Sequence, residues 1–271
     1  MISILMRSHN DIEYIKSTVT ALLAQEVDDD LEIISCDDNS IDGSKEYLAS
    51  INKLVHLTPP EGKYVPGKTL NYMVKHAKGE YIVFNNGDAI PQHKEYIKNL
   101  VAPLKNNNCD CVYGNQIARK DAFLVVKKDY ERAFGDGSIS KTWGGFFSLV
   151  SSGFRKADLI AKPFNETIQY SEDADWVLRN QAKIVYVKDA IVEHSHNYTL
   201  KEVKKRFFNE GKADNQMGKK PQCFLLFLKH FTAEVVRDYI YIIKQRNYKK
   251  LFYPLIYRLV QKFSYYRGTK Q

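Results

Sequence analysis

The chain has 271 residues, of which 44% are hydrophobic and 27% are charged, a composition typical of a globular protein rather than of a disordered one. This length accommodates one large α/β domain with a modest extension. The longest apolar runs are far shorter than the roughly 20 residues that span a bilayer, and no secretory leader opens the sequence. We therefore expect neither a membrane-spanning nor a secreted protein.

The formal net charge is +8, and the positive excess comes largely from the C-terminal quarter. Such an excess suits an anionic partner, either a membrane surface or nucleic acid. The four cysteines form no Cys-x-x-Cys pair, and Cys109 and Cys111 share one face of a strand-like run. We interpret them as reduced structural thiols of a cytoplasmic protein rather than as zinc ligands or a disulfide.

Strands and helices alternate in the first half of the chain. Apolar residues at helical spacing predict helices near residues 12–23 and 70–77, and Asn10 with Glu13 would form a capping box at the first. Short apolar runs predict strands at residues 2–6, 31–36, 55–57 and 81–84. This order predicts an α/β fold with a doubly wound, mostly parallel, Rossmann-like sheet, whose ligands lie at the carboxyl ends of the strands.

The second half follows a different pattern. A polar loop is expected over residues 119–140, and Ser171 would cap a helix that reaches about Ala182. A strand at 184–187 is followed by an alternating run, 190–196, in which Val192, His194 and His196 share one face. Thr199 and Glu202 predict a second capping box, at the start of a helix that ends near residue 213.

Polar clusters follow several of these predicted elements. Asp37 and Asp38 come directly after the second strand, and Asn86-Gly87-Asp88 follows the fourth. Glu172, Asp173 and Asp175 lie in the first turn of a predicted helix. Carboxylates and imidazoles gathered in this way are the groups needed to hold a nucleotide, a divalent metal and an acceptor hydroxyl. Each cluster also has a simpler explanation, as turn residues, helix-terminal charges or a buried strand histidine.

In this order and spacing the motifs resemble those of family 2 glycosyltransferases of the GT-A fold, and among them bacterial rhamnosyltransferase-like enzymes of surface polysaccharide assembly. The similarity covers about residues 2–215. The segments that carry it are Arg7-Ser8-His9-Asn10-Asp11, Asp37 to Ser44, Gly67-Lys68-x-x-Asn71, Gly79 to Asp88, Glu172 to Arg179 and His194 to Tyr198. The rhamnosyl assignment depends on Asp129 to Asp136 and on Tyr265-Tyr266-Arg267-Gly268.

The resemblance implies a divalent metal, Mn²⁺ or Mg²⁺, beside the diphosphate of a nucleotide sugar. Such a metal stabilises the charge of the departing diphosphate as a Lewis acid. The family usually has Asp-x-Asp at the end of the fourth strand, whereas this chain has Asn86 in place of the first Asp. Asp88 is then the one carboxylate ligand, and His194, or His196 on the same face, is expected to complete the site.

The resemblance also implies the catalytic base, Asp173. The acceptor hydroxyl is a poor nucleophile, so a carboxylate must take its proton during attack on the anomeric carbon. We expect the dipole of the helix to favour the ionised form of Asp173. A single base on the face opposite the leaving group implies inversion at the anomeric carbon.

Further residues are expected to bind the nucleotide or the substrate. Asp38 would accept a hydrogen bond from the imide N–H of uracil or thymine, with His9 near the base or ribose and Asp37 in support. Arg7 and Lys68 would reach the diphosphate or the acceptor, although an exposed lysine of no function is an equal alternative. The other residues expected in this role are Asn71, Asn86, Glu172, Asp175 and Trp176; Trp176 is equally suited to helix packing.

The resemblance divides the chain at about residue 215. Residues 1–215 would form the glycosyltransferase domain, with a nucleotide-binding half, 1–108, and an acceptor-side half, 109–215. Residues 216–271 would form an amphipathic helical extension, in which apolar residues at helical spacing alternate with basic ones that include Lys249 and Lys250. This extension either lies on the anionic inner-membrane surface or packs on the domain or on a second subunit of a homodimer.

The expected function is therefore transfer of a sugar from a dTDP- or UDP-sugar, with dTDP-L-rhamnose a candidate, to a glycan or lipid-linked acceptor. The enzyme would be cytoplasmic or peripheral on the cytoplasmic face of the inner membrane. One alternative is a non-catalytic nucleotide-sugar-binding or assembly subunit of the same fold, which the Asn86 replacement suggests. A nucleic-acid-binding protein is the other, but no recognised nucleic-acid motif is present, so we expect no such partner.

Overall fold

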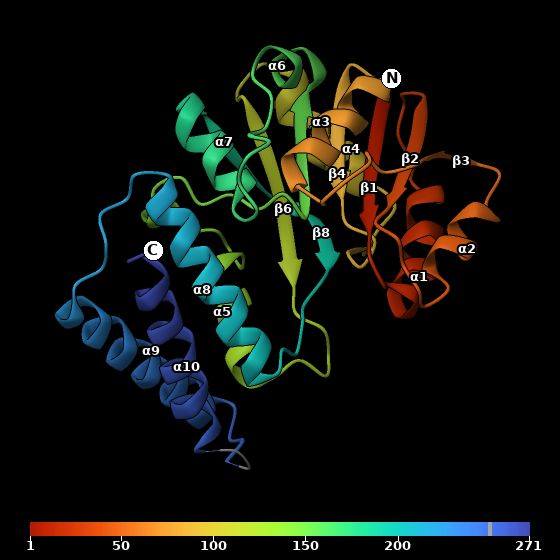
Figure 1. Ribbon diagram of the computed structural model, residues 1–271. Coiled ribbons are helices and arrows are strands. Elements are labelled where there is room, and N and C mark those ends of the chain that lie inside the picture. Colours follow the sequence, from red (N-terminus) through yellow and green to blue (C-terminus); the bar gives the residue numbers. More distant parts are fainter. Residues whose placement is uncertain (249–250) are drawn as a thin grey trace. The chain divides into compact units, whose positions relative to one another are not determined.

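The computed structural model describes residues 1–248 and 251–271 (Figure 1). Lys249 and Lys250, which belong to the basic residues of the predicted extension, lie outside the described residues. The chain forms two compact units. The first unit contains residues 1–117, 132–168 and 172–194, and the second contains residues 118–131, 169–171 and 195–271. The helix that ends at Gln216 belongs to the second unit. The boundary near residue 215 that the family resemblance implies stays a prediction.

The first unit is built on an eight-stranded sheet with the strand order β3-β2-β1-β4-β7-β6-β8-β5. β1, β2, β3 and β4 are parallel to one another, as are β6 and β8, while β7 and β5 run antiparallel to their neighbours. The bounds are β1 Ile2–Ser8, β2 Leu31–Asp37, β3 Leu54–Leu57, β4 Tyr81–Asn85, β5 Ile90–Pro91, β6 Cys111–Ile117, β7 Ser151–Arg155 and β8 Ile184–Glu193. The mostly parallel α/β sheet expected from the sequence is confirmed.

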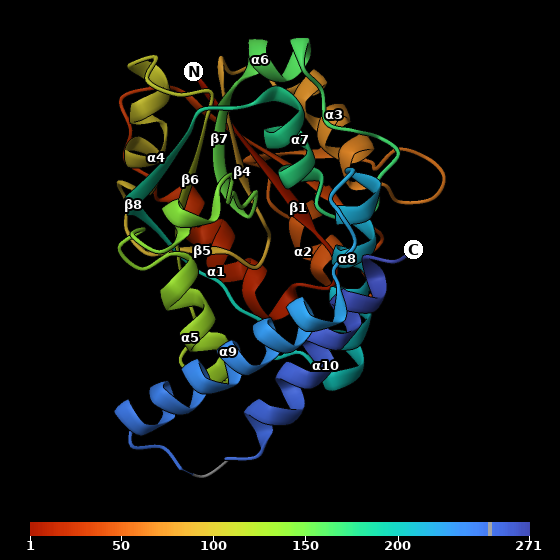
Figure 2. The same ribbon diagram turned by 90° about the vertical axis from the view of Figure 1, so that its left-hand side faces the viewer.

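Helices cover both faces of this sheet (Figure 2). One apolar cluster joins alternate residues of β1 to the buried sides of α1 (Ile12–Leu23) and α4 (Tyr96–Lys105), so these two helices pack on one face. On the other face, Phe84, Phe154 and Trp176 meet edge to face. The remaining helices of this unit are α2 (Ser44–Ala49), α3 (Pro66–His76), α6 (Lys156–Ala161), α7 (Glu172–Asn180) and the 3₁₀ helix η1 (Ser140–Trp143).

Four local predictions differ from the structure. Asn10 has a φ of +57°, and α1 begins at Ile12 without a side-chain cap, so the first capping box does not form. Ser171 has a φ of +60°, which differs from the extended conformation of most N-cap residues. The segment expected to be a polar loop contains α5 (Leu124–Ala133), whose buried apolar residues lie at positions 125 and 126. The two strands expected at 184–187 and 190–196 form one strand, β8, with a register shift opposite Gly114 and Asn115.

The second unit is helical and comprises most of α5 together with α8 (Leu200–Gln216), α9 (Phe224–Lys244) and α10 (Tyr253–Gly268). The predicted capping box of Thr199 and Glu202 is present at the start of α8. Gly211 of α8 and Gly268 of α10 allow the two helices to approach closely, because a Cβ on either glycine would lie within 2.3 Å of the other helix's backbone. Among the described residues, none of the helices combines the length and apolar character needed to cross a bilayer.

Candidate active site

The carboxyl end of β2 carries the first acidic pair, and its two members differ in their contacts. Asp37 is buried and accepts hydrogen bonds from the hydroxyls of Ser8 and Ser40, both at 2.6 Å, and from the Ser40 amide at 2.8 Å. Its carboxylate therefore joins the ends of β1 and β2 to the following turn. Asp38, the next residue, is half-buried, and its backbone carbonyl oxygen lies 2.7 Å from Nδ1 of His9. The structure thus brings the His9 side chain to the backbone of Asp38.

The turn after β4 lies against the end of β1. The Gly87 amide donates to the Arg7 carbonyl at 2.8 Å, and a Cβ on Gly87 would lie 3.2 Å from that oxygen and 2.9 Å from Oδ2 of Asp11. A side chain at position 87 would therefore push the two segments apart. Burial and the nearby carboxylate of Asp88 raise the pKa of Asp11 to about 7. Negative potential is thus concentrated where Asp11 and Asp88 approach each other.

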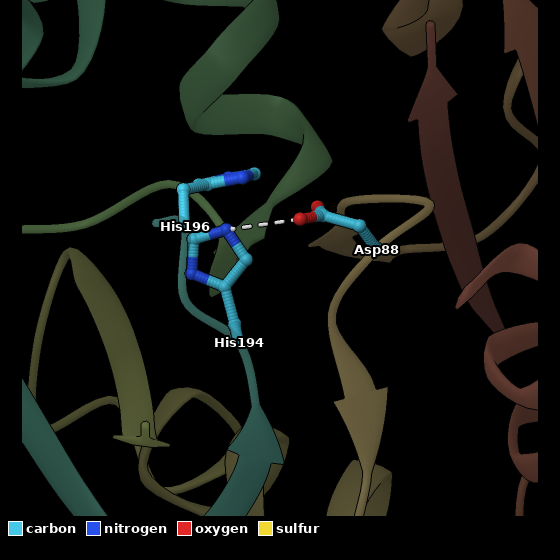
Figure 3. A group of neighbouring side chains, drawn as sticks. All are labelled: Asp88, His194 and His196. Atoms are coloured by element: carbon cyan, nitrogen blue, oxygen red, sulfur yellow. Dashed lines mark ion pairs between the residues drawn. The ribbon is translucent and has the colours of Figure 1, made fainter. Parts of the chain in front are cut away.

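Asp88 faces His194 across this site (Figure 3). Both side chains are buried, and Oδ2 of Asp88 lies 3.4 Å from Nε2 of His194. The other ring nitrogen, Nδ1, lies 3.0 Å from Oε1 of Gln116. Because a carbonyl oxygen can only accept, Nδ1 donates its proton to Gln116, and Nε2 is the nitrogen that faces Asp88. His196 follows two residues along the chain and is drawn with them.

The donor set of this pair fits a divalent cation. A carboxylate oxygen and an imidazole nitrogen are both ligands that Mn²⁺ accepts, so Asp88 and His194 would suit such an ion. Gln116 in turn accepts from His194 and donates from Nε2 to the Ser148 hydroxyl at 2.8 Å, which holds the ring orientation. His196 belongs to the second unit, so the pair in the first unit carries the argument for a metal site.

Asp173 lies in the first turn of α7 and is held from two sides. Its Oδ1 accepts from the Ala174 amide at 2.8 Å and its Oδ2 from the Leu149 amide at 3.3 Å. Burial, and then the neighbouring Glu172 carboxylate, raise the pKa of Asp173 to about 6. The helix dipole was expected to favour the ionised form, but desolvation is the larger effect. A carboxylate with this pKa is ionised at neutral pH and is a stronger base than an exposed aspartate.

Arg7 and Glu172 come together although 165 residues separate them. Nη1 of Arg7 lies 3.3 Å from Oε1 of Glu172 and 3.2 Å from the hydroxyl of Tyr64. The three side chains connect the end of β1, the segment before α3 and the start of α7. The Glu172 carboxylate beside Asp173 is thereby ion-paired, and Arg7 places a positive charge at the carboxyl end of the sheet.

Several other predicted binding residues have structural contacts. Trp176 is 1% exposed, packs on Phe154 and donates Nε1 to the Lys162 carbonyl at 2.6 Å. Asp175 accepts from Nε of Arg179 at 2.7 Å, one turn along α7. The backbone of Asn86 bonds to Val150 and closes the turn with Ala89. These residues stabilise the helix and the turn that carry Asp173 and Asp88.

Asn71 and Lys68 both lie on α3 and were both predicted to bind substrate. Their contacts differ, and substitutions at the two positions test whether Asn71 instead stabilises the fold. The buried amide of Asn71 accepts from the Phe164 amide and donates to the Phe164 carbonyl and to Glu166, each at 2.9 Å. Asn71→Ala should lower the free energy of unfolding by about 2–3 kcal/mol, since it leaves buried backbone groups unpaired. Lys68→Ala, an exposed position on the same helix, should change it by less than about 0.5 kcal/mol. Urea unfolding measures both; an unfolding midpoint of Asn71→Ala equal to wild type would contradict the structural role.

Sequence reasoning missed Gln116, Tyr64 and Asp11. Gln116 lies within strand β6 in a run with no motif, and only the pairing of β6 with β8 places it beside His194. Tyr64 lies in a segment without periodicity. Asp11 was visible as part of Arg7-Ser8-His9-Asn10-Asp11, but its proximity to Asp88 depends on the adjacency of β1 and β4.

Residues 3–164 match the model of the glycosyl transferase family 2. This match covers more than half of the chain, so the chain belongs to glycosyl transferase family 2 and is a glycosyltransferase. The family resemblance inferred from the sequence motifs is confirmed.

Similar proteins of known name include bacterial sugar transferases. The chain is 25% identical over 236 residues to the GalNAc(5)-diNAcBac-PP-undecaprenol beta-1,3-glucosyltransferase of Campylobacter jejuni, covering 82% of this chain and 69% of that protein. It is 25% identical to the O-antigen chain rhamnosyltransferase WbaN of Salmonella anatum, covering 66% and 61%, and 29% identical to RfbN of Salmonella typhimurium, covering 62% and 60%. The chain thus spans about three fifths of the length of these two rhamnosyltransferases.

Solved structures show the same fold at low sequence identity. The mannosyltransferase PcManGT of Pyrobaculum calidifontis, in complex with GDP-Man and Mn²⁺, superposes with a TM-score of 0.65 at 14% identity, covering 98% of this chain and 85% of that one. Glucosyl-3-phosphoglycerate synthase of Mycobacterium tuberculosis, with Mn²⁺ and UDP, gives a TM-score of 0.58 at 17% identity, covering 81% and 80%. The expected GT-A fold with a helical C-terminal region is therefore confirmed.

Proposed function

We propose that the chain is a metal-dependent, inverting glycosyltransferase of bacterial surface polysaccharide assembly. It moves a sugar from a dTDP- or UDP-sugar, with dTDP-L-rhamnose the first candidate, to a glycan or lipid-linked acceptor. The observation that carries the proposal is the buried pair of Asp88 and His194, with the histidine tautomer set by Gln116. Transfer takes place in the cytoplasm, at the inner face of the membrane.

The names of the relatives support the choice of substrates. Two of them are rhamnosyltransferases of O-antigen chains, and a third acts on an undecaprenol-linked diphosphate glycan. Mn²⁺ accompanies a nucleotide or nucleotide sugar in two structures of the same fold.

Each residue of the site has a role in this proposal. Asp173 takes the proton of the acceptor hydroxyl onto its carboxylate as the oxygen attacks the anomeric carbon. Asp88 and His194 would hold the divalent cation, which would supply positive charge to the departing diphosphate. Arg7, which is ion-paired with Glu172, orients the groups near the leaving phosphate.

The nucleotide base would bind at the end of β2. Asp38 accepts the imide N–H of uracil or thymine, and His9, whose Nδ1 faces the Asp38 carbonyl, packs on the base or ribose. Asp37 supports both by holding the turn through Ser8 and Ser40. Because the acceptor attacks from the side opposite the diphosphate and one base serves it, the product has the inverted anomeric configuration.

Thermal stabilisation by nucleotides tests this function, because a ligand that binds only the folded state raises its melting temperature. The panel comprises UDP, dTDP, GDP and CDP and their sugars, each with Mn²⁺, with Mg²⁺ and with a chelator. We expect a rise only with uridine or thymidine compounds, larger with metal present, followed by turnover of the matching sugar. Binding without turnover would favour the non-catalytic subunit, and no rise with any compound would refute the donor class.

A further inference from the structure

The two C-terminal helices expose apolar side chains over much of their length. On α9, Leu225, Val236, Ile240 and Ile243 recur at helical spacing, and each leaves between 49% and 76% of its surface exposed. The α10 segment has a second such stripe, whose members are Phe252, Leu255, Ile256, Leu259 and Phe263, with exposures between 40% and 78%. Side chains of this size normally turn inward, so these two stripes require a non-aqueous neighbour.

The interior of the same unit contains a network of charged side chains next to its apolar cluster. Arg258 of α10 is 1% exposed and donates to Asp238 of α9 through Nε at 2.7 Å and to Asp129 of α5 at 2.8 Å. Lys128 of α5, also buried, lies 2.6 Å from Asp238 and 2.7 Å from Glu234. These ion pairs connect three helices of the second unit.

The α9 and α10 segment therefore differs from an ordinary water-exposed helix pair, whose charged groups lie mainly on the surface. An ion network is buried beside apolar side chains such as Phe227, Ile242 and Tyr257, while further large apolar groups face outward. A desolvated ion network adds little stability over an apolar core, but it leaves the apolar faces free for another contact. In the described part of the chain, neither helix is apolar enough to cross a bilayer. A membrane contact of these helices would therefore be a contact with the bilayer surface.

The charge of the segment identifies the surface. Residues 219–271 contain twelve Lys and Arg and two acidic residues, so their net charge is +10 (12 − 2). This charge exceeds the +8 of the whole chain. The exposed basic side chains among the described residues include Lys229, Arg237, Lys244, Arg246 and Arg267. Apolar stripes flanked by exposed cations match an anionic bilayer, in which acyl chains meet the stripes and phosphates meet the cations.

A second copy of the chain is the competing occupant. A two-fold dimer brings the same patch of both copies together, which would place two strongly positive segments against each other. Anionic lipid headgroups attract the basic side chains, whereas self-association brings like charges together and adds repulsion. The observations therefore favour the bilayer.

We propose that the outward faces of α9 and α10 bind the anionic cytoplasmic leaflet of the membrane, with the apolar stripes of both helices inserted among the acyl chains. This proposal deepens the proposed function, on which it rests for the choice of leaflet, since a lipid-linked acceptor lies in the same membrane. Binding itself needs neither donor nor acceptor and can be measured without them.

Co-sedimentation of the full chain with vesicles tests the proposal. We expect binding to vesicles of 70% phosphatidylcholine and 30% phosphatidylglycerol, and at least tenfold weaker binding to phosphatidylcholine alone or in high salt. The double variant Ile240→Ser/Ile243→Ser should reduce binding to the anionic vesicles at least tenfold. The matched control Leu23→Ser/Ile160→Ser removes apolar side chains of 41% and 53% exposure from the first unit and should change it less than twofold.

Two results would overturn the proposal. One is no co-sedimentation with the anionic vesicles, or binding that the Ile240→Ser/Ile243→Ser variant leaves unchanged. The other is a stable dimer in sedimentation velocity without lipid that the same variant converts to monomer, which would assign the faces to a second copy. Nucleotide-induced thermal stabilisation of this variant should equal that of wild type, so failure of membrane binding and failure of the proposed catalytic function give different results.

Discussion

Asp173→Asn should reduce the turnover number by roughly 100- to 10,000-fold, the range of general-base contributions. Asparagine keeps the size of the side chain and its carbonyl oxygen can still accept from the Leu149 or Ala174 amide, but it cannot take a proton. Nucleotide-sugar binding should remain close to that of wild type. Steady-state kinetics, with calorimetry for donor binding, measures both. Turnover within tenfold of wild type would exclude Asp173 as the base.

The pH dependence provides a second readout of the same residue. Because the folded-state pKa of Asp173 is about 6, the wild-type rate should fall as pH decreases through 6. The stability effect has the opposite sign. The raised pKa means that the folded state takes up this proton before the unfolded state does, so the contribution of Asp173 to the free energy of unfolding increases as pH falls from about 6 toward 4. A loss of activity near pH 6 without unfolding is the result expected if Asp173 is the base.

Asp175→Asn is the matched control on the same helix. It removes the charge that pairs with Arg179, which is 43% exposed, and such pairs contribute about 1 kcal/mol or less. We expect turnover within about threefold of wild type. If Asp175→Asn reduced turnover as strongly as Asp173→Asn, catalysis would depend on the total negative charge at the start of α7 rather than on Asp173 as a single base.

Asp88→Ala should remove the metal dependence of donor binding. The variant loses the one carboxylate of the pair with His194, so the affinity for Mn²⁺ should fall by roughly 100-fold or more, beyond the effect of an outer-shell change. The readout is thermal stabilisation by UDP or dTDP compounds as Mn²⁺ is titrated. We expect the stabilisation to become equal with and without metal, and catalytic efficiency to fall with it.

Gln116→Leu should have a smaller effect on metal binding than Asp88→Ala. It removes the acceptor that holds Nδ1 of His194 but leaves both ligands in place, so Mn²⁺ affinity should fall by roughly 10- to 100-fold. Asp28→Asn, at an exposed position in the same unit, should leave it unchanged. An unaltered metal requirement in Asp88→Ala would place the cation elsewhere, and an unaltered affinity in Gln116→Leu would remove the positioning role.

Much of the site was predictable because parallel strands end at one edge of a sheet. Asp38 and Asp88 each follow a strand whose apolar run was clear, and His9 follows the first strand. Sequence order alone therefore placed them at the same edge. The pairing of Asp88 with His194, 106 positions apart, was expected only from the family resemblance.

Other features depended on contacts that no local pattern reveals. Asp37 and Asp38 are adjacent and chemically identical, yet one is held by Ser8 and Ser40 and the other is half-buried beside His9. Asn71 was expected to bind substrate, but its amide holds Phe164. The pKa of Asp173 was expected to be low from the helix dipole, whereas burial raised it.

The sequence by itself determined the class of fold, the order of strands in the first half, the family and the group of acidic and imidazole side chains at the strand ends. These follow from periodicity and from motifs, which are local along the chain. The tertiary structure alone decided which carboxylate is desolvated, which nitrogen of His194 faces Asp88 and which faces of α9 and α10 remain outside. Those properties depend on the distances between residues far apart in sequence, and burial and pairing, rather than residue type, set the chemistry of each side chain.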